Sequence, residues 1–198
     1  MKNFRLAQLV ENFRRIKKFA ILAVIITKVL AIPTILEVKY KIINVNGKSK
    51  KVATIEQPNG TWGYYTKSGA VFDVIVKNEL AESTSIHWHG LILPNDQDGV
   101  AGITQDPIAP GKEYHYKFPL KQSGTYWMHA HYGLQEQDYV EAPLIIETTD
   151  DINYDQVVVM FQDFSMKTPQ QILQSLLPPG VKYTPHLMAM PIPKATSS

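Results

Sequence analysis

Alternating apolar and polar residues in short runs form the main pattern of this 198-residue chain. The run "VFDVIV" at 71–76 places its apolar side chains on one face and Asp73 on the other, and a period of two predicts a β-strand with one buried face. The run "EYHYKFPL" at 113–120 alternates in the same way. Between two further runs, the dipeptide Asn46-Gly47 favours a tight hairpin turn. Together these patterns predict a β-rich domain.

Aromatic and β-branched residues gather in other short stretches that are bounded by turn-forming residues. Strands are predicted for "TSIHWHGLIL" at 84–93, "GTYWMHAHYG" at 124–133, "APLIIET" at 142–148 and "QVVVMFQDF" at 156–164, the last two as buried strands. The stretch 94–112 is dense in Pro, Gly, Asn and Asp, which predicts a long loop. Many short strands separated by loops predict an all-β sandwich.

The pattern changes near Asp150, where "TTDDINYDQ" is polar and acidic and predicts a boundary or linker. Beyond it, "TPQQILQSLL" at 168–177 has a helical pattern. Thr168 is expected to cap this helix, and Pro169 suits its first position. A proline-rich tail follows. These pieces are too few to form a second domain by themselves.

The first 31 residues have the composition of a secretory leader. The basic run "RRIKKF" precedes the apolar run "AILAVII", and the small residues Val29 and Ala31 follow where a signal would be cleaved. The uninterrupted apolar run 19–26 is far below the roughly 20 residues that span a bilayer, so no stable membrane span is expected. An organellar transit peptide is an alternative, favoured by the arginines and opposed by the lack of serine. Export, to the periplasm, is the leading interpretation.

Composition narrows the classes of function. Apolar residues make up 44% of the chain and charged residues 19%, an ordinary globular balance. The net charge of +2, with the basic excess concentrated near the start, does not indicate nucleic-acid binding. The chain has no cysteine, which excludes disulfides, thiolate metal sites and a cysteine nucleophile.

Four of the six histidines form two matched pairs. Residues two apart in a strand share a face, about 7 Å apart along the chain. His87 and His89 therefore share one face, with Trp88 on the other, and His129 and His131 are arranged alike. If the two strands are neighbours, four imidazoles converge on one volume. Such a cluster predicts a transition-metal site.

The competing interpretation is structural, because a lone histidine in a strand is usually a hydrogen-bonded residue without a metal. Two pairs, each near Trp and Gly, favour the metal. Imidazole does not choose among zinc, copper and nickel, and no acidic residue stands at the spacing of a zinc hydrolase. A fifth histidine, His115, alternates with aromatic residues and lies beside Lys117, which predicts a position on a solvent face.

The stretch from "IHWHG" to "HYGLQ", residues 86–135, resembles the first cupredoxin domain of multicopper oxidases. The run "HYGLQEQDYVEAPLII" at 131–146 is most similar to their laccase-like, bacterial copper-resistance branch. The resemblance extends from about Gly69 to Phe164. It implies a Greek-key β-sandwich and a three-copper cluster that reduces dioxygen to water. Met128 and Ala130 depart from the family's pattern at positions that are not ligands.

The resemblance also implies roles for single residues. His87 would bind the type 2 copper, His89 and His129 one type 3 copper, and His131 the other. Asp98 matches the acidic residue that relays protons near the cluster, although a turn aspartate beside a glycine is an equally good interpretation.

Half of the family's copper ligands have no counterpart in this sequence, and neither does the cysteine of its type 1 copper. The stretch 155–177 is similar to the opening strand and helix of the family's second domain. The expected segments are a signal-like leader at 1–31, a cupredoxin-like domain at 32–150, and at 151–198 a linker with an incomplete second domain.

Three functions stay open. The chain is expected to be the amino-terminal part of an oxidase, inactive until a partner chain supplies the missing domains. Alternatively it is an exported copper-binding or copper-tolerance module without turnover, or a gene remnant without function. His186, Met188 and Met190 in the tail form a weaker candidate for copper binding.

Overall fold

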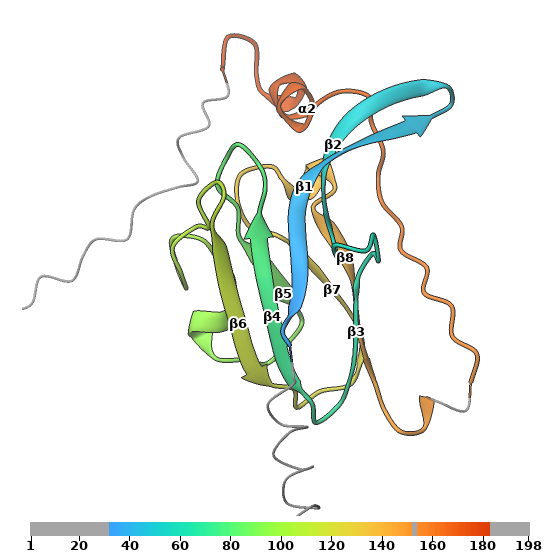
Figure 1. The fold of residues 1–198 in the computed structure, drawn as a ribbon. Helices are drawn as coiled ribbons and strands as arrows, with labels where there is room; N and C mark the ends of the chain where they lie inside the picture. Colours follow the sequence, from blue (N-terminus) through green and yellow to red (C-terminus); the bar gives the residue numbers. More distant parts are fainter. Residues whose placement is uncertain (1–31, 152–153, 183–198) are drawn as a thin grey trace, which may run out of the picture. The chain divides into compact units, whose positions relative to one another are not determined.

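The computed structural model describes residues 32–151 and 154–182, and the leader and the tail predicted above lie outside them. Eight strands form two four-stranded sheets, which Figure 1 shows as two layers. The strands are β1 (Thr34–Val45), β2 (Lys48–Glu56), β3 (Tyr64–Lys67), β4 (Val71–Asn78), β5 (Ile86–His89), β6 (Glu113–Pro119), β7 (Gly124–Ala130) and β8 (Glu141–Glu147). The predicted all-β sandwich is confirmed.

The first sheet has the order β2-β1-β4-β6. Strands β1 and β2 form the predicted hairpin, and Asn46 and Gly47 at its turn both have positive φ, 50° and 76°. Asn and Gly tolerate this left-handed backbone better than other residues, which is why the dipeptide marks a tight turn. Strand β1 pairs with β4 in parallel, and β4 pairs with β6 antiparallel.

The second sheet has the order β3-β8-β7-β5 and carries three of the paired histidines, with His131 directly after β7. Strand β5 lies at its edge and pairs antiparallel with β7, which in turn pairs antiparallel with β8. The predicted loop 94–112 connects β5 to β6 and contains one short 3-10 helix, η1 (Asn95–Gln97). A second one, η2 (Glu136–Asp138), lies between β7 and β8.

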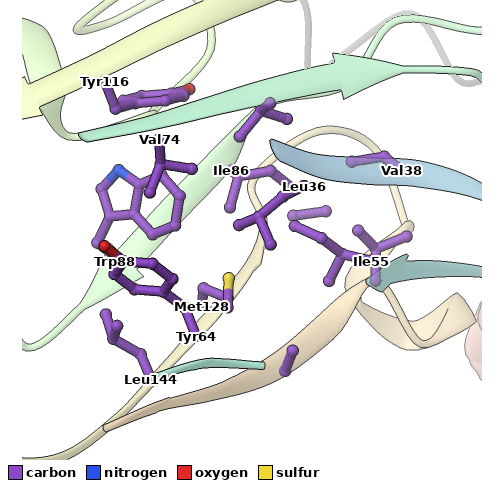
Figure 2. Close-up of a cluster of buried hydrophobic side chains, with 14 of the residues drawn as sticks. Leu36, Val38, Ile55, Tyr64, Val74, Ile86, Trp88, Tyr116, Met128 and Leu144 are labelled. Carbon is purple, nitrogen blue, oxygen red and sulfur yellow. The ribbon is translucent and has the colours of Figure 1, made fainter. Parts of the chain in front are cut away.

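The core lies between the sheets and is built around Trp88 (Figure 2). Its indole meets Phe72 edge-on, with 4.6 Å between ring centroids, and Tyr116 likewise at 5.0 Å. Met128, the register partner of Trp88, is also fully buried. Burial of aromatic side chains of this size dominates core stability. The inward face of the β5–β7 pair is therefore fixed by packing.

The carboxyl-terminal part differs from the sequence-based expectation in one respect. Residues 156–164 do not form the predicted buried strand: they have no regular structure, and Val157 and Phe161 are 86% and 92% exposed. The stretch contains the continuous apolar run of a buried strand, but no sheet neighbour in the described chain pairs with it.

The helix predicted beyond residue 168 is confirmed as α2 (Pro169–Leu176). Thr168 caps it. Its hydroxyl oxygen accepts a hydrogen bond from the backbone N–H of Gln171, and the side-chain oxygen of Gln171 accepts one from the backbone N–H of Thr168. This reciprocal pair satisfies two backbone donors that the first turn leaves free. None of the helices in the described ranges is long and apolar enough to cross a membrane.

Candidate metal centre

The antiparallel pairing of β5 with β7 brings three of the histidines together. His87 lies directly opposite His129, and directly opposed residues in a sheet share a face. His89 lies two residues along β5 on that face. The three ring centroids are 5.4–5.6 Å apart, and one nitrogen from each ring lies within 4.8 Å of the others.

His131 follows directly after β7 and lies at the border of the same group. Its amide donates to the carbonyl oxygen of Ser85 at 2.9 Å, which extends the strand pairing by one step. Its ring centroid is 5.8 Å from that of His87 and 6.2 Å from that of His129. The structure thus gathers all four residues of the two H-x-H motifs.

The ring of His87 is held by the loop that follows β5. Its Nδ1–H donates to the backbone oxygen of Asp98 at 2.8 Å, and an Asp98 carboxylate oxygen lies 3.3 Å from the same nitrogen. These contacts place the proton on Nδ1 and leave the Nε2 lone pair for a metal ion. Metal-binding histidines usually show this arrangement, with the second nitrogen donating to a carbonyl or carboxylate.

Gly99 allows this loop to pass close to β5. Its φ is +75°, and a Cβ at this position would lie 1.7 Å from the carbonyl oxygen of Ile86. Only glycine fits so tight an approach with that backbone. The glycine therefore fixes the distance between Asp98 and His87.

His129 is buried and has a similar pair of acceptors. Its Nδ1 lies 3.0 Å from the carbonyl oxygen of Ala130 and 3.1 Å from a carboxylate oxygen of Glu136. Burial lowers the pKa of His129 below its usual value, so the ring is neutral near pH 7. A neutral imidazole is the form that binds metals. Sequence reasoning missed Glu136, because a residue in a short 3-10 turn carries no periodic signal.

His89 and His129 also touch each other. Nδ1 of His89 lies 3.2 Å from Nε2 of His129, so one nitrogen of the pair accepts a hydrogen bond from the other. Trp127 stacks on both rings, with centroids 5.0 Å from His89 and 4.3 Å from His129. The indole limits the rotation of both imidazoles.

A groove of about 540 Å³ opens beside His131. The loop after β5 and helix α2 contribute apolar side chains to its walls, among them Ile103 and Leu173, and Glu136 adds a carboxylate. The site therefore has an open side next to His131.

The fifth histidine named from the sequence, His115, is not part of this cluster. His115 is on the opposite sheet with its side chain 46% exposed, which confirms the predicted solvent face, and its Nε2 contacts Asp73 at 2.6 Å. His186, Met188 and Met190 fall outside the described residues.

Comparison with known proteins agrees with this geometry. The family model described as multicopper oxidase matches residues 37–151. Copper resistance protein A of Escherichia coli is 40% identical over 141 residues, which are 68% of this chain and 23% of that protein. A homologue of that protein from Pseudomonas syringae pv. tomato is 39% identical over 141 residues, which are again 68% of this chain and 23% of the other protein. The chain thus spans about a quarter of the length of these relatives.

Solved structures give the same result for the fold. The laccase from Botrytis aclada superposes with a TM-score of 0.52 and 37% identity, over 59% of this chain and 23% of that one. The multicopper oxidase from Pseudomonas thermotolerans gives a TM-score of 0.55 and 28% identity, over 59% and 29% of the two chains. The chain belongs to the multicopper oxidase family, and its fold is the expected cupredoxin-like sandwich.

The residues present fit copper, the metal that the family implies. The donor set is made of imidazoles, which suit copper, and in His87 and His129 the Nδ1 contacts leave Nε2 as the donor. The carboxylates of Asp98 and Glu136 lie behind the rings, where they orient the ligands.

Proposed function

We propose that this chain contributes half of the ligands of a copper cluster in a laccase-like multicopper oxidase that reduces dioxygen to water. The observation that carries the proposal is the convergence of His87, His89 and His129, with His131 beside them, on one face of the β5–β7 pair. Copper would supply the electron transfer to dioxygen, a reaction that protein side chains do not perform alone.

The individual roles proposed are those that the resemblance to multicopper oxidases implies for these positions. We assign His87 to the type 2 copper, His89 and His129 to one type 3 copper, and His131 to the other. Asp98 holds the Nδ1 proton of His87 through its backbone oxygen. Its carboxylate is about one-third exposed, so we propose that it exchanges protons with solvent beside the site.

The proposal requires further cupredoxin domains, from a partner chain or from a longer protein. The 198 residues contain no cysteine for a type 1 copper, and the matched relatives are about four times as long as the region they share with this chain. We therefore propose that this chain alone has no oxidase turnover. We also propose the division into a leader at 1–31, a cupredoxin domain at 32–150 and the beginning of a second one at 151–198, with export to the periplasm.

A second candidate function is copper binding without turnover. It is favoured by one observation: His87 and His129 are already oriented by contacts within this chain, without any partner. Such a module would hold copper in the exported compartment through the same histidines.

The test is calorimetric titration of the folded chain with Cu²⁺, beside an oxygen-consumption assay with a phenolic substrate. The wild type should bind copper, and the variant with His87, His89, His129 and His131 replaced by alanine should not. His115→Ala is the matched control and should bind as the wild type does. Equal binding by the fourfold variant would overturn both functions. Copper binding that gains turnover only when the missing domains are added supports the oxidase, and binding that never gains it supports the module.

Oxidase turnover by this chain alone, or a strong blue absorption after copper is added, would contradict the assignment of a half-site. The blue band requires a copper–thiolate bond, and the chain has no thiol.

A further inference from the structure

Two histidines on opposite strands of the site are supported in the same way. Nδ1 of His87 has a carbonyl oxygen at 2.8 Å and the carboxylate of Asp98 at 3.3 Å. Nδ1 of His129 has a carbonyl oxygen at 3.0 Å and the carboxylate of Glu136 at 3.1 Å. The two carboxylates come from different loops, so the pairing of β5 with β7 does not by itself produce this similarity.

The loop that carries Glu136 is itself anchored. Gln135, which precedes it, is buried, and its side-chain oxygen accepts a bond from the Thr84 hydroxyl at 2.7 Å. Its side-chain nitrogen donates to the carbonyl oxygen of Ser83 at 2.8 Å and to Glu82 at 3.1 Å. These bonds tie the loop after β7 to the residues just before β5. Glu136 is therefore placed by contacts of its loop with the segment that leads into β5.

We propose that Glu136 is a positioning residue for His129. Its carboxylate accepts the Nδ1–H of the ring, keeps the proton on that nitrogen and limits ring rotation, so that Nε2 faces the metal. Its negative charge also offsets part of the charge of a bound cation. The effect on copper rests on the proposed function, whereas the effect on the His129 ring belongs to the metal-free chain.

The carbonyl of Ala130 offers Nδ1 a second acceptor, so the experiment has to separate the two. Three variants serve this purpose: Glu136→Leu removes the acceptor and the charge, Glu136→Gln keeps an acceptor oxygen without the charge, and Glu113→Leu is the control at an exposed position of β6. Thermal unfolding of each metal-free variant shows whether the fold is retained.

The first measurement is nitrogen NMR of the histidine rings in the metal-free chain. The wild type and Glu136→Gln should keep His129 in the form with the proton on Nδ1, and Glu136→Leu should populate the other tautomer. An unchanged tautomer in folded Glu136→Leu would overturn the proposal and assign the orientation to the ring's other contacts, with the Ala130 carbonyl and with His89.

The second measurement is Cu²⁺ affinity by calorimetry, with the electron paramagnetic resonance spectrum of the bound ion. Glu136→Leu should bind about 10- to 100-fold more weakly, as is usual when a carboxylate behind a ligand is removed. Glu136→Gln should recover most of the affinity, and Glu113→Leu should match the wild type. Equal affinity and spectra for all variants would contradict the role toward copper.

The failure of this proposal differs from that of the proposed function. If the wild type binds no copper, the proposed function fails while the NMR result still decides whether Glu136 orients His129. If the wild type binds copper and Glu136→Leu is unchanged in both measurements, only the positioning role fails. If Glu136→Leu does not fold, Glu136→Gln decides whether the positioning role holds. A folded Glu136→Gln chain that has lost both the Nδ1–H tautomer of His129 and the wild-type Cu²⁺ affinity would contradict the role, because its amide oxygen should still accept the Nδ1–H.

Discussion

His87 and His129 face each other across the β5–β7 pair with 5.4 Å between their ring centroids, and the next pair along, Trp88 and Met128, faces the opposite way into the core. One set of backbone hydrogen bonds thus fixes the metal ligands on one face and core residues on the other. The alternation of side chains in a strand makes the two inseparable. Packing of the core consequently orients the candidate site.

Replacement of Trp88 tests this dependence. Its side chain is fully buried and contacts Phe72 and Tyr116, so Trp88→Ala should lower the free energy of unfolding by about 3–5 kcal/mol. Chemical denaturation measures the loss. Ile92→Ala, at a side chain that is 74% exposed, should stay within about 0.5 kcal/mol of the wild type. Similar values for the two variants would show that Trp88 does not organise the core.

Lys50 holds the carboxyl-terminal segment against the sandwich. This buried lysine donates to the backbone oxygens of Ser165 at 2.8 Å and Lys167 at 3.2 Å, and its ammonium lies 5.0 Å from the centre of the Tyr139 ring. Hydrogen bonds from a charged donor are each worth about 1.5–3 kcal/mol. Lys50→Met should therefore release the segment that leads into α2.

Limited proteolysis with chymotrypsin measures that release through cleavage after Phe164. The cut should be several-fold faster in Lys50→Met than in the wild type, because the cleaved backbone must leave the sandwich to enter the protease. Lys48→Met, at an exposed position of the same strand, is the control and should be cut at the wild-type rate. Equal rates in all three chains would remove the anchoring role.

Most of the fold could be predicted from the sequence, because β4 buries one face and shows alternation, while β8 is buried on both faces and shows a continuous apolar run. The run around Asp73 and the Asn46-Gly47 turn are examples. The stretch 156–164 has the same apolar character but no neighbouring strand among the described residues. A pattern of apolar residues indicates what a segment could bury, and the available partner decides whether it does so.

The candidate site was predictable to the same degree. The two H-x-H motifs indicate shared faces by spacing alone, and a family resemblance suggests that the strands are neighbours. Glu136 and Gln135 reach the site through a turn and a set of side-chain hydrogen bonds that follow no period. Such supporting contacts depend on tertiary structure and could not be predicted from spacing.

Acid should weaken the fold partly through Glu56. This buried carboxylate contacts Lys39 at 3.2 Å and Lys41 at 2.9 Å. Burial opposes its ionisation, but the hydrogen bonds from Lys41 and Lys39 outweigh burial and hold the pKa of Glu56 below its usual value. A carboxyl with a lower pKa in the folded state stabilises the fold above its unfolded pKa of about 4.3. That contribution is lost as pH falls through the folded pKa.

Glu56→Gln should therefore be less stable than the wild type at neutral pH, and the difference should shrink as the solution is acidified below about pH 4. Urea denaturation at a series of pH values measures it. Glu79→Gln, at an exposed position, is the control and should follow the wild-type profile. A difference between Glu56→Gln and wild type that stays constant with pH would contradict the ion-pair explanation.

Gly99 gives the sharpest test of how the loop after β5 supports the site. A Cβ there would collide with the Ile86 carbonyl oxygen, so Gly99→Ala must push the loop away from β5 and move Asp98 from His87. Gly111→Ala is a matched control, since its φ of +69° is similar and nothing lies within 4 Å of the added Cβ. The control carries only the backbone cost of a positive φ, about 1–2 kcal/mol.

The two glycine variants should consequently differ in both stability and copper binding. Gly99→Ala should lose several-fold more stability than Gly111→Ala in urea denaturation, because backbone must move in the first and not in the second. In the fraction that folds, calorimetry should show weaker Cu²⁺ binding for Gly99→Ala and wild-type binding for Gly111→Ala. If both glycines tolerate alanine equally, the loop is not held against β5 as the structure shows, and the support of His87 by Asp98 loses its basis.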